Sequence, residues 1–152
     1  MERSELTAML PKNRDDVESA RAIVALGYPT VEPVLKSLFQ WLETSSSPVE
    51  LIVREFFAEI GEPALPLVRE ALQAQIKPAR KHCLLRHVLP HWPSEVLEKL
   101  GGELWNLLQE PHGLNVWSLK LMLDKGINDR VKLLQWRELF LEDLTEQLEA
   151  LR

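Results

Sequence analysis

The chain has 152 residues and a mass of 17.5 kDa, a length that suits a single domain with a sizeable core. Its 45% hydrophobic and 27% charged residues are ordinary values for a soluble globular protein. Acidic residues outnumber basic ones 23 to 18, and the resulting net charge of -5 disfavours a protein that wraps duplex nucleic acid over a broad face.

Several further classes are disfavoured by what the sequence lacks. A single cysteine, Cys83, is too few for an internal disulfide or for a zinc site of several thiolates. No apolar run approaches the roughly 20 residues of a membrane helix, and the first residues lack the pattern of a secretory signal peptide. The sequence also lacks phosphate-binding glycine loops and hydrolase motifs. We therefore expect a cytoplasmic protein without membrane contact, cofactor or catalytic residues.

Helix signals recur along the chain, whereas alternating strand patterns are nearly absent. A first pair of helices is expected over residues 13–42 and a second pair over residues 47–74. The start of the second pair carries the sharpest local signal in the chain. Ser47 can cap the helix, Pro48 suits its first position, and Glu50 completes a capping box.

The remaining helices follow in the same manner. A third pair is expected over residues 78–109, where Gly101-Gly102 weakens or bends the second helix. C-terminal helices are expected over residues 115–151, separated at Gly126. The predicted apolar stripe of the long final helix consists of Val131, Leu134, Leu141, Leu144, Leu148 and Leu151. We expect this stripe to pack on the body and close the core, although its heptad spacing also suits pairing with a second copy.

An internal repeat lies in the first two pairs. At an offset of 34 residues, Gly27-x-Pro29 corresponds to Gly61-x-Pro63, and the flanking apolar positions also match. The glycine allows the first helix to end with positive φ, and the proline two residues later starts the second helix. Helix pairs that repeat roughly every 30–45 residues are typical of α-solenoids. We therefore predict an all-α fold, a short HEAT-like α-solenoid of antiparallel helix pairs closed by the long C-terminal helix. An irregular helical bundle with one accidental duplication is the alternative.

The corner segments also carry a family resemblance. Its motifs are Leu10-Pro11-Lys12-x-x-Asp15, Leu26-Gly27-Tyr28-Pro29-x-Val31-Glu32-Pro33-Val34-Leu35, Trp41-Leu42, Pro48-Val49 and Ile60-Gly61-Glu62-Pro63-x-Leu65-Pro66. Over roughly residues 6–110, their order and spacing resemble a bacterial family of small proteins catalogued as domain-of-unknown-function family 5071. The resemblance implies a HEAT-like all-α fold in a protein that is not secreted. It implies no activity, because none is established for that family.

A basic segment, residues 77–91, separates two acidic parts of the chain. It carries four bases and no acid, a net charge of +4, between flanks of -5 and -4, and it contains three of the four histidines. Such a segment suits docking of a carboxylate-rich partner or of phosphate, in a contact that weakens with salt. The predicted partner-binding residues are Lys77, Arg80, Lys81, Arg86, His87 and Trp92. A solvated basic face without a partner is the alternative.

The geometry of a regular helix refines this expectation. At 100° per residue, Arg80, His87 and His91 fall on one stripe of the helix. Trp92 lies in a corner between two prolines, a position that suits a partly exposed side chain at an interface, but filling a gap between helices is the commoner role of such a tryptophan and is the alternative. Several tryptophans on a helical surface favour an interface.

Metal and thiol chemistry find little support in the same segment. His87 and His91 are four residues apart and could share a metal ion, but Pro90 interrupts the helix between them and no glutamate completes a metalloprotease motif. No metal site is therefore predicted. Cys83 lies among leucines, and we expect a buried structural thiol rather than a nucleophile.

Three functional hypotheses follow from the sequence. The leading one is a non-enzymatic protein-binding module, because stacked helix pairs present an extended surface. By analogy, such a protein serves as an adaptor or as an immunity-type protein that neutralises a toxin. The alternative is nucleic-acid binding through residues 77–91. The third is an enzyme that uses His82 or His87 with an acid from another helix. We expect a monomer or a weak homodimer.

Overall fold

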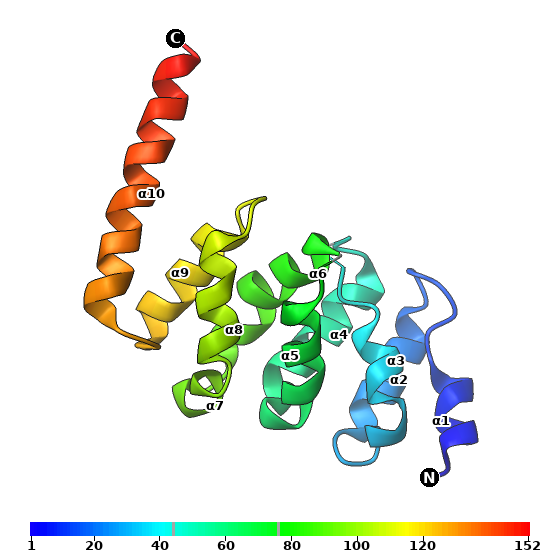
Figure 1. Ribbon diagram of the computed structural model, residues 1–152. Coiled ribbons are helices and arrows are strands. Elements are labelled where there is room, and N and C mark those ends of the chain that lie inside the picture. The colour runs from blue at the N-terminus through cyan, green and yellow to red at the C-terminus, as the bar shows by residue number, and fades with distance from the viewer. Residues whose placement is uncertain (44, 76) are drawn as a thin grey trace.

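The computed structural model describes residues 1–43, 45–75 and 77–152, and every regular element in these ranges is helical (Figure 1). The predicted all-α fold is therefore confirmed. The α-helices are α1 (Arg3–Met9), α2 (Val17–Leu26), α3 (Leu35–Phe39), α4 (Pro48–Ile60), α5 (Leu65–Gln73), α6 (Pro78–Cys83), α7 (Ser94–Glu98), α8 (Gly101–Asn106), α9 (Leu114–Lys125) and α10 (Arg130–Ala150). Four 3-10 turns, η1 (Glu32–Val34), η2 (Glu62–Ala64), η4 (Leu89–His91) and η5 (Leu107–Gln109), and a π-helical turn, η3 (Leu84–Val88), connect or extend them.

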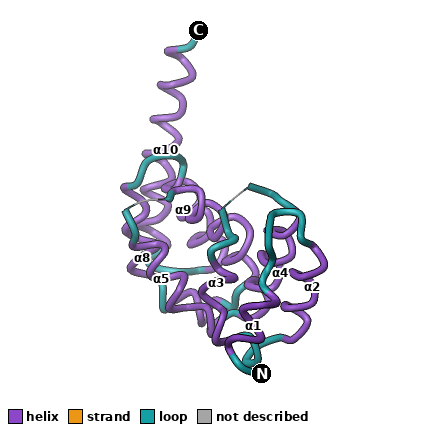
Figure 2. The backbone as a smooth tube through the Cα atoms, turned by 90° about the vertical axis from the view of Figure 1, so that its right-hand side faces the viewer, coloured by secondary structure: helices purple, strands orange, loops and turns teal. Residues whose placement is uncertain are grey.

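Helices from successive pairs pack side by side in space and form a stack of two layers. In one layer, α2 contacts α4, α4 contacts η3, and η3 contacts α9, while α5 and α8 are in contact in the other layer. The view along the stack in Figure 2 places α2 and α4 on one side and α5 and α8 on the other. This arrangement buries one face of each helix against its neighbours. The HEAT-like character of the stack stays a prediction.

The core runs through the space between the two layers. Phe57 of α4 is fully buried, and its ring meets the rings of Phe39 and Phe56 edge to face at centroid distances of 5.4 Å. At the first end of the stack, Leu6 of α1 is also fully buried. The sequence analysis did not predict α1, because its seven residues are too few to show a helical period.

The two corners of the repeat confirm the role of their glycines and correct the register that follows them. Gly27 and Gly61 end α2 and α4 with φ of +71° and +64°. The next helix begins at Glu32-Pro33-Val34-Leu35 in the first pair and at Glu62-Pro63-Ala64-Leu65 in the second, an offset of 30 instead of 34. The predicted equivalence of Pro29 and Pro63 is therefore wrong. Pro29 follows a cis peptide bond in an additional turn between the glycine and η1.

The burial pattern is compatible with the shorter offset, although the offset of 34, which matches Val34 with Val68 and Leu38 with Leu72, pairs buried residues equally well. With 30 residues between equivalent positions, Leu38 matches Val68 and Leu42 matches Leu72. All four side chains are buried, with exposed fractions between 0% and 3%. The second helices of both pairs therefore present the same apolar face to the core.

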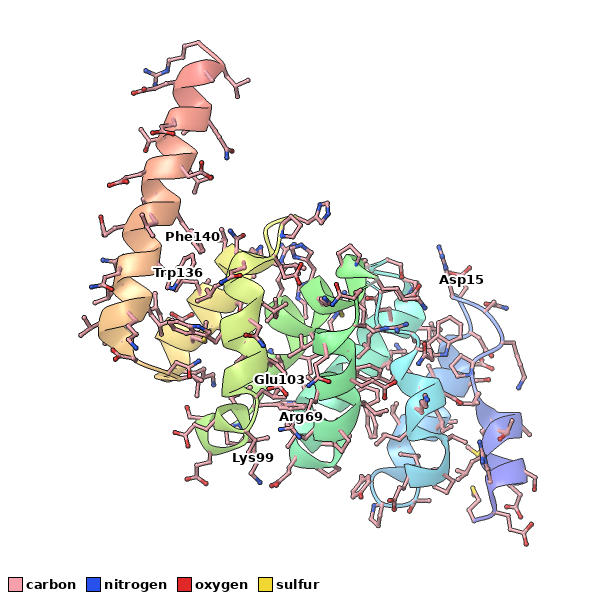
Figure 3. All side chains as sticks on the ribbon, in the orientation of Figure 1. Asp15, Arg69, Lys99, Glu103, Trp136 and Phe140 are labelled. Carbon is pink, nitrogen blue, oxygen red and sulfur yellow. The ribbon has the colours of Figure 1, made fainter. Side chains whose placement is uncertain are left out.

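The second helix of the third pair is interrupted at the predicted place. Two short helices, α7 and α8, meet at Leu100 and Gly101. Asn128 Nδ2 donates to the Gly101 carbonyl at 2.9 Å, and a Cβ at Gly101 would lie 3.3 Å from the side chain of Asn128. Within the same layer, Arg69 of α5 donates to Glu103 of α8 at 2.9 Å (Figure 3). The glycine therefore allows the loop before α10 to approach α8 closely.

The final helix does not close the core along its length, so this expectation is wrong. Only Leu133 of α10 is buried, and Trp136 and Phe140 lie half-buried on the side that faces the body (Figure 3). Leu141 and Leu148 are 51% and 62% exposed. At 1.5 Å per residue, the 12 residues of α9 span about 18 Å and the 21 residues of α10 about 32 Å. The second half of α10 therefore extends beyond the body, as Figure 1 shows.

Candidate functional site

The basic segment does not form one continuous exposed face, because its helix changes period. The α-helix α6 gives way at residue 84 to the π-helical turn η3, in which the backbone bonds span five residues instead of four. Arg80 is only 9% exposed, whereas Arg86 is exposed and His87 half-buried. The predicted common stripe of Arg80, His87 and His91 is therefore wrong.

Arg80 turns inward and ties α6 to the end of α3. Its guanidinium donates through Nε to the Leu42 carbonyl at 3.2 Å, and through Nη2 to the Gln40 carbonyl at 3.2 Å and to Glu43 at 3.1 Å. Lys77 is half exposed and lies 3.9 Å from the same Glu43 carboxylate. Of the predicted partner-binding residues, Arg80 therefore belongs to the framework, and Lys77 lies beside it.

Two other predicted partner-binding residues are also buried. Lys81 is 4% exposed and Trp92 is fully buried. The indole Nε1 of Trp92 donates to the Phe57 carbonyl at 2.9 Å, so the corner between the two prolines folds its indole into the core instead of exposing it. The interpretation of Trp92 as an exposed interface residue is therefore wrong and the gap-filling alternative holds, and neither residue presents its side chain as a docking surface.

The remaining predicted residues converge with an arginine from another helix. Arg86, His87 and His91 line an open groove of about 640 Å³ together with Arg54 of α4. The α4 wall of this groove also contains Leu51, Glu55, Ala58 and Glu59. The α4 wall therefore carries two glutamates beside Arg54, whereas the wall formed by η3 and η4 carries Arg86 and two histidines and no acid.

A buried carboxylate beneath the groove positions Arg54. Glu50 is fully buried, and its Oε1 lies 3.3 Å from Nη2 of Arg54. The predicted cap of α4 is confirmed, because the Glu50 amide donates to Ser47 Oγ at 3.2 Å. The Glu50 carboxylate accepts from the Ser46 amide at 2.9 Å, one residue before the amide that a capping box uses.

The only cysteine contacts the same buried carboxylate. Cys83 is fully buried, and its Sγ lies 3.6 Å from Glu50 Oε1. The predicted burial of this thiol is confirmed. Within the described ranges, no three His, Cys, Asp or Glu side chains are grouped so that they could hold a metal ion.

Arg86 is held in place by an aromatic ring that the sequence analysis did not assign to it. Its guanidinium carbon lies 4.4 Å from the centre of a ring of Trp117 in α9, a cation–π contact. Arg86 also lines a second cavity of about 280 Å³, to which Arg54 does not contribute. Its lining combines the apolar residues Leu85, Pro90, Trp117 and Leu121 with the charged residues Arg86, Lys120, Asp124 and Lys125. Arg86 therefore lines two cavities, the open groove and this one.

The electrostatic setting of the groove lowers the proton affinity of one histidine. Partial burial lowers the pKa of His87 below its usual 6.5, and the positive charges of Arg54 and Arg86 lower it further. The Glu50 charge acts in the opposite direction but does not reverse the shift. At neutral pH, the groove therefore owes its positive charge to its two arginines and not to His87.

The sequence analysis did not assign the α4 residues of the groove or the aromatic partner of Arg86, for two different reasons. Leu51, Arg54, Glu55 and Ala58 recur on one outer face of α4, a spacing that predicts a solvated face and not a groove wall. The contact of Trp117 with Arg86 joins residues 31 positions apart, and nothing in the local pattern pairs them.

The comparisons with known proteins place the chain in a family without adding a function. A family model described as "Domain of unknown function (DUF5071)" matches residues 9–119. No curated protein and no solved structure matches the chain. Within the described residues, no helix has both the length and the apolar content that crossing a membrane requires.

Proposed function

The chain belongs to the DUF5071 family, and we propose that it is a non-enzymatic protein-binding scaffold that docks a short segment of a partner protein against Arg86. The observation that carries this proposal is the placement of Arg86, which is exposed, stacked on Trp117 and part of the lining of two cavities. Arginine and tryptophan are the residue types most enriched at the energetic centres of protein interfaces.

The stacking on Trp117 prepares Arg86 to bind a carboxylate. A guanidinium that is already fixed loses little conformational freedom when it forms two parallel hydrogen bonds with a carboxylate. In the second cavity beside it, Lys120 is paired with Asp124 at 2.6 Å, so the additional net positive charge is that of Lys125. The ligand group expected at this point is therefore an aspartate or glutamate side chain of the partner.

The second cavity defines the neighbouring residue of the partner. Its apolar wall, formed by Leu85, Pro90, Trp117 and Leu121, suits an aliphatic or aromatic side chain. A segment with an acidic residue beside an apolar residue therefore fits the surface. An adaptor or an immunity-type protein would use such a surface to hold its partner. The cytoplasmic location of this protein stays a prediction.

The nucleic-acid-binding alternative has less support. Of the four bases in residues 77–91, Arg80 and Lys81 are buried, so they cannot follow a phosphate backbone. Glu55 and Glu59 on the opposite wall of the groove would also repel phosphates.

Selection from a random peptide library displayed on phage tests the proposal. The wild-type chain is immobilised beside Arg86→Glu and Arg21→Glu, a matched control at an exposed arginine of α2. We expect enrichment of peptides with an acidic residue next to an apolar one, binding that weakens as salt rises, loss with Arg86→Glu and retention with Arg21→Glu. Failure to enrich such peptides, or equal binding to both variants, would contradict the proposal.

A further inference from the structure

A small cavity away from the Arg86 site is lined by α3, α5 and the start of α6. It measures about 160 Å³, and it shares no lining residue with the open groove or with the second cavity. We call it the α3–α5 cavity. Its lining has an apolar part and a charged part.

The apolar part of the α3–α5 cavity limits the size of what can enter. It is formed by Phe39, Leu67, Ala71 and Ala74, and the two alanines leave room that longer side chains would fill. An apolar cavity of about 150 Å³ holds benzene, whereas drug-sized ligands occupy pockets of about 300–1,000 Å³. The apolar part of a ligand is therefore limited here to about six non-hydrogen atoms.

A nearly buried arginine belongs to the charged part of the lining. The side chain of Arg80 is 10% exposed, and its guanidinium carbon lies 5.9 Å from the centre of the Phe39 ring. Its Nε and Nη2 donate to Leu42, Gln40 and Glu43, but its Nη1 has no acceptor among the described residues. Arg80 is therefore a fixed cation at the cavity with one donor group left for a ligand.

The charges around Arg80 favour a ligand with a single negative charge. Lys36 and Lys77 also line the cavity, and Glu70 is the only acid among the described residues of its lining. Glu43 does not line the cavity, but it accepts from Arg80 at 3.1 Å and lies 3.9 Å from Nζ of Lys77. Because the two acids offset two of the three cations, one positive charge is left over. A carboxylate matches this charge, whereas a doubly charged phosphate group exceeds it.

We propose that the α3–α5 cavity binds a small monocarboxylic acid with a short aliphatic or aromatic part. The carboxylate accepts from Nη1 of Arg80 in the positive field of Lys36 and Lys77, and the apolar part packs in the space beside Phe39. This binding site is separate from the docking of a partner segment at Arg86. It gives Arg80 a second role besides tying α6 to α3.

A nuclear magnetic resonance titration of the isotopically labelled full chain with sodium benzoate tests the proposal. Neutral benzamide is the matched ligand of similar size. We expect saturable shifts with benzoate at residues 36–40, 67–74 and 77–80, and at least about tenfold weaker binding of benzamide, which carries no negative charge for the guanidinium. Equal affinities for the two ligands, or the lack of a saturable shift, would overturn the proposal. Benzoate shifts confined to residues 85–91 and 117–125 would also overturn it and would place the acid at Arg86 instead.

Variants of the two lysines test the charged part without disturbing the contacts of Arg80. Lys36→Glu/Lys77→Glu reverses two exposed charges at the cavity, and we expect the dissociation constant for benzoate to rise by about tenfold or more. Arg21→Glu/Arg130→Glu is the matched control, because it changes the net charge equally at exposed positions elsewhere. Equal weakening by the two double variants would contradict the proposal.

Filling the cavity tests the apolar part. Ala71→Leu places a larger side chain in the space assigned to the ligand, and we expect the saturable benzoate shifts to disappear. Ala22→Leu, at an exposed position of α2, is the matched control and should bind benzoate as the wild type does. Benzoate binding that Ala71→Leu leaves unchanged would show that the acid does not enter the α3–α5 cavity.

Discussion

Arg80 and Arg86 lie six residues apart in the same basic segment, but the fold gives them opposite roles. Arg80 donates hydrogen bonds to the carbonyls of Gln40 and Leu42, whereas Arg86 stacks on Trp117 and remains exposed. The π-helical turn η3 separates their directions. Charge in the sequence therefore identified the segment but not which of its cations reach solvent.

This difference predicts unequal effects on stability. Arg80→Ala leaves two inward-facing carbonyls without their donor, and we expect a loss of about 1–3 kcal/mol in the free energy of unfolding. Arg86→Ala removes an exposed side chain and should change that free energy by less than about 1 kcal/mol. Urea denaturation of both variants measures the difference. Equal losses would show that Arg80 is not a framework residue.

The lowered pKa of His87 predicts that the free energy of unfolding depends on pH, and it also fixes the sign of that dependence. In the unfolded chain this histidine titrates near 6.5, above its folded pKa, so the unfolded state binds the proton first as the pH falls. Its contribution to stability is therefore fully present above about pH 6.5 and is lost on acidification towards the folded pKa. Urea titrations of wild type and His87→Gln from pH 7.5 to about pH 5 should show a smaller acid loss in the variant. The same slope in both proteins would refute this assignment.

At the level of elements, local signals predicted most helix ends. Ser47 and Gly61 lie where capping chemistry expects them, because a cap acts on the backbone within a few residues. The offset of 30 residues between equivalent helix starts and the π-helical turn were missed, because both depend on how the helices pack. The repeat of Glu-Pro at residues 32–33 and 62–63 was the signal that identifies the correct register.

Replacing glycine by alanine is expected to change the free energy of unfolding in opposite directions at two positions. Gly61→Ala introduces a Cβ at a φ of +64°, and we expect a loss of about 1 kcal/mol in the free energy of unfolding. Gly102→Ala lies in α8, where an added Cβ meets no atom within 4 Å, and should stabilise the protein by about 0.5 kcal/mol. Thermal unfolding of the two variants compares them directly. A stabilised Gly61→Ala would contradict the assigned role of this corner.

At the scale of the whole molecule, the stack of helix pairs assembles a site that no single segment contains. The groove and the cavity beside it join α4, η3, η4 and α9, so Arg54 and Trp117 reach Arg86 from positions more than 30 residues away. The sequence predicted Arg86, His87 and the all-α framework. It did not predict this convergence, because residue spacing within one helix carries no information about its neighbours.

The most direct test of the central claim is a nuclear magnetic resonance titration of the isotopically labelled chain with the acidic peptide that the library selection enriches. Binding against Arg86 predicts that the largest shifts map to residues 51–59, 85–91 and 117–125. The Arg86→Glu variant should show none of these shifts at the same peptide concentration. Shifts confined to α10 or to the layer of α3 and α5, or an unchanged titration of Arg86→Glu, would contradict the account.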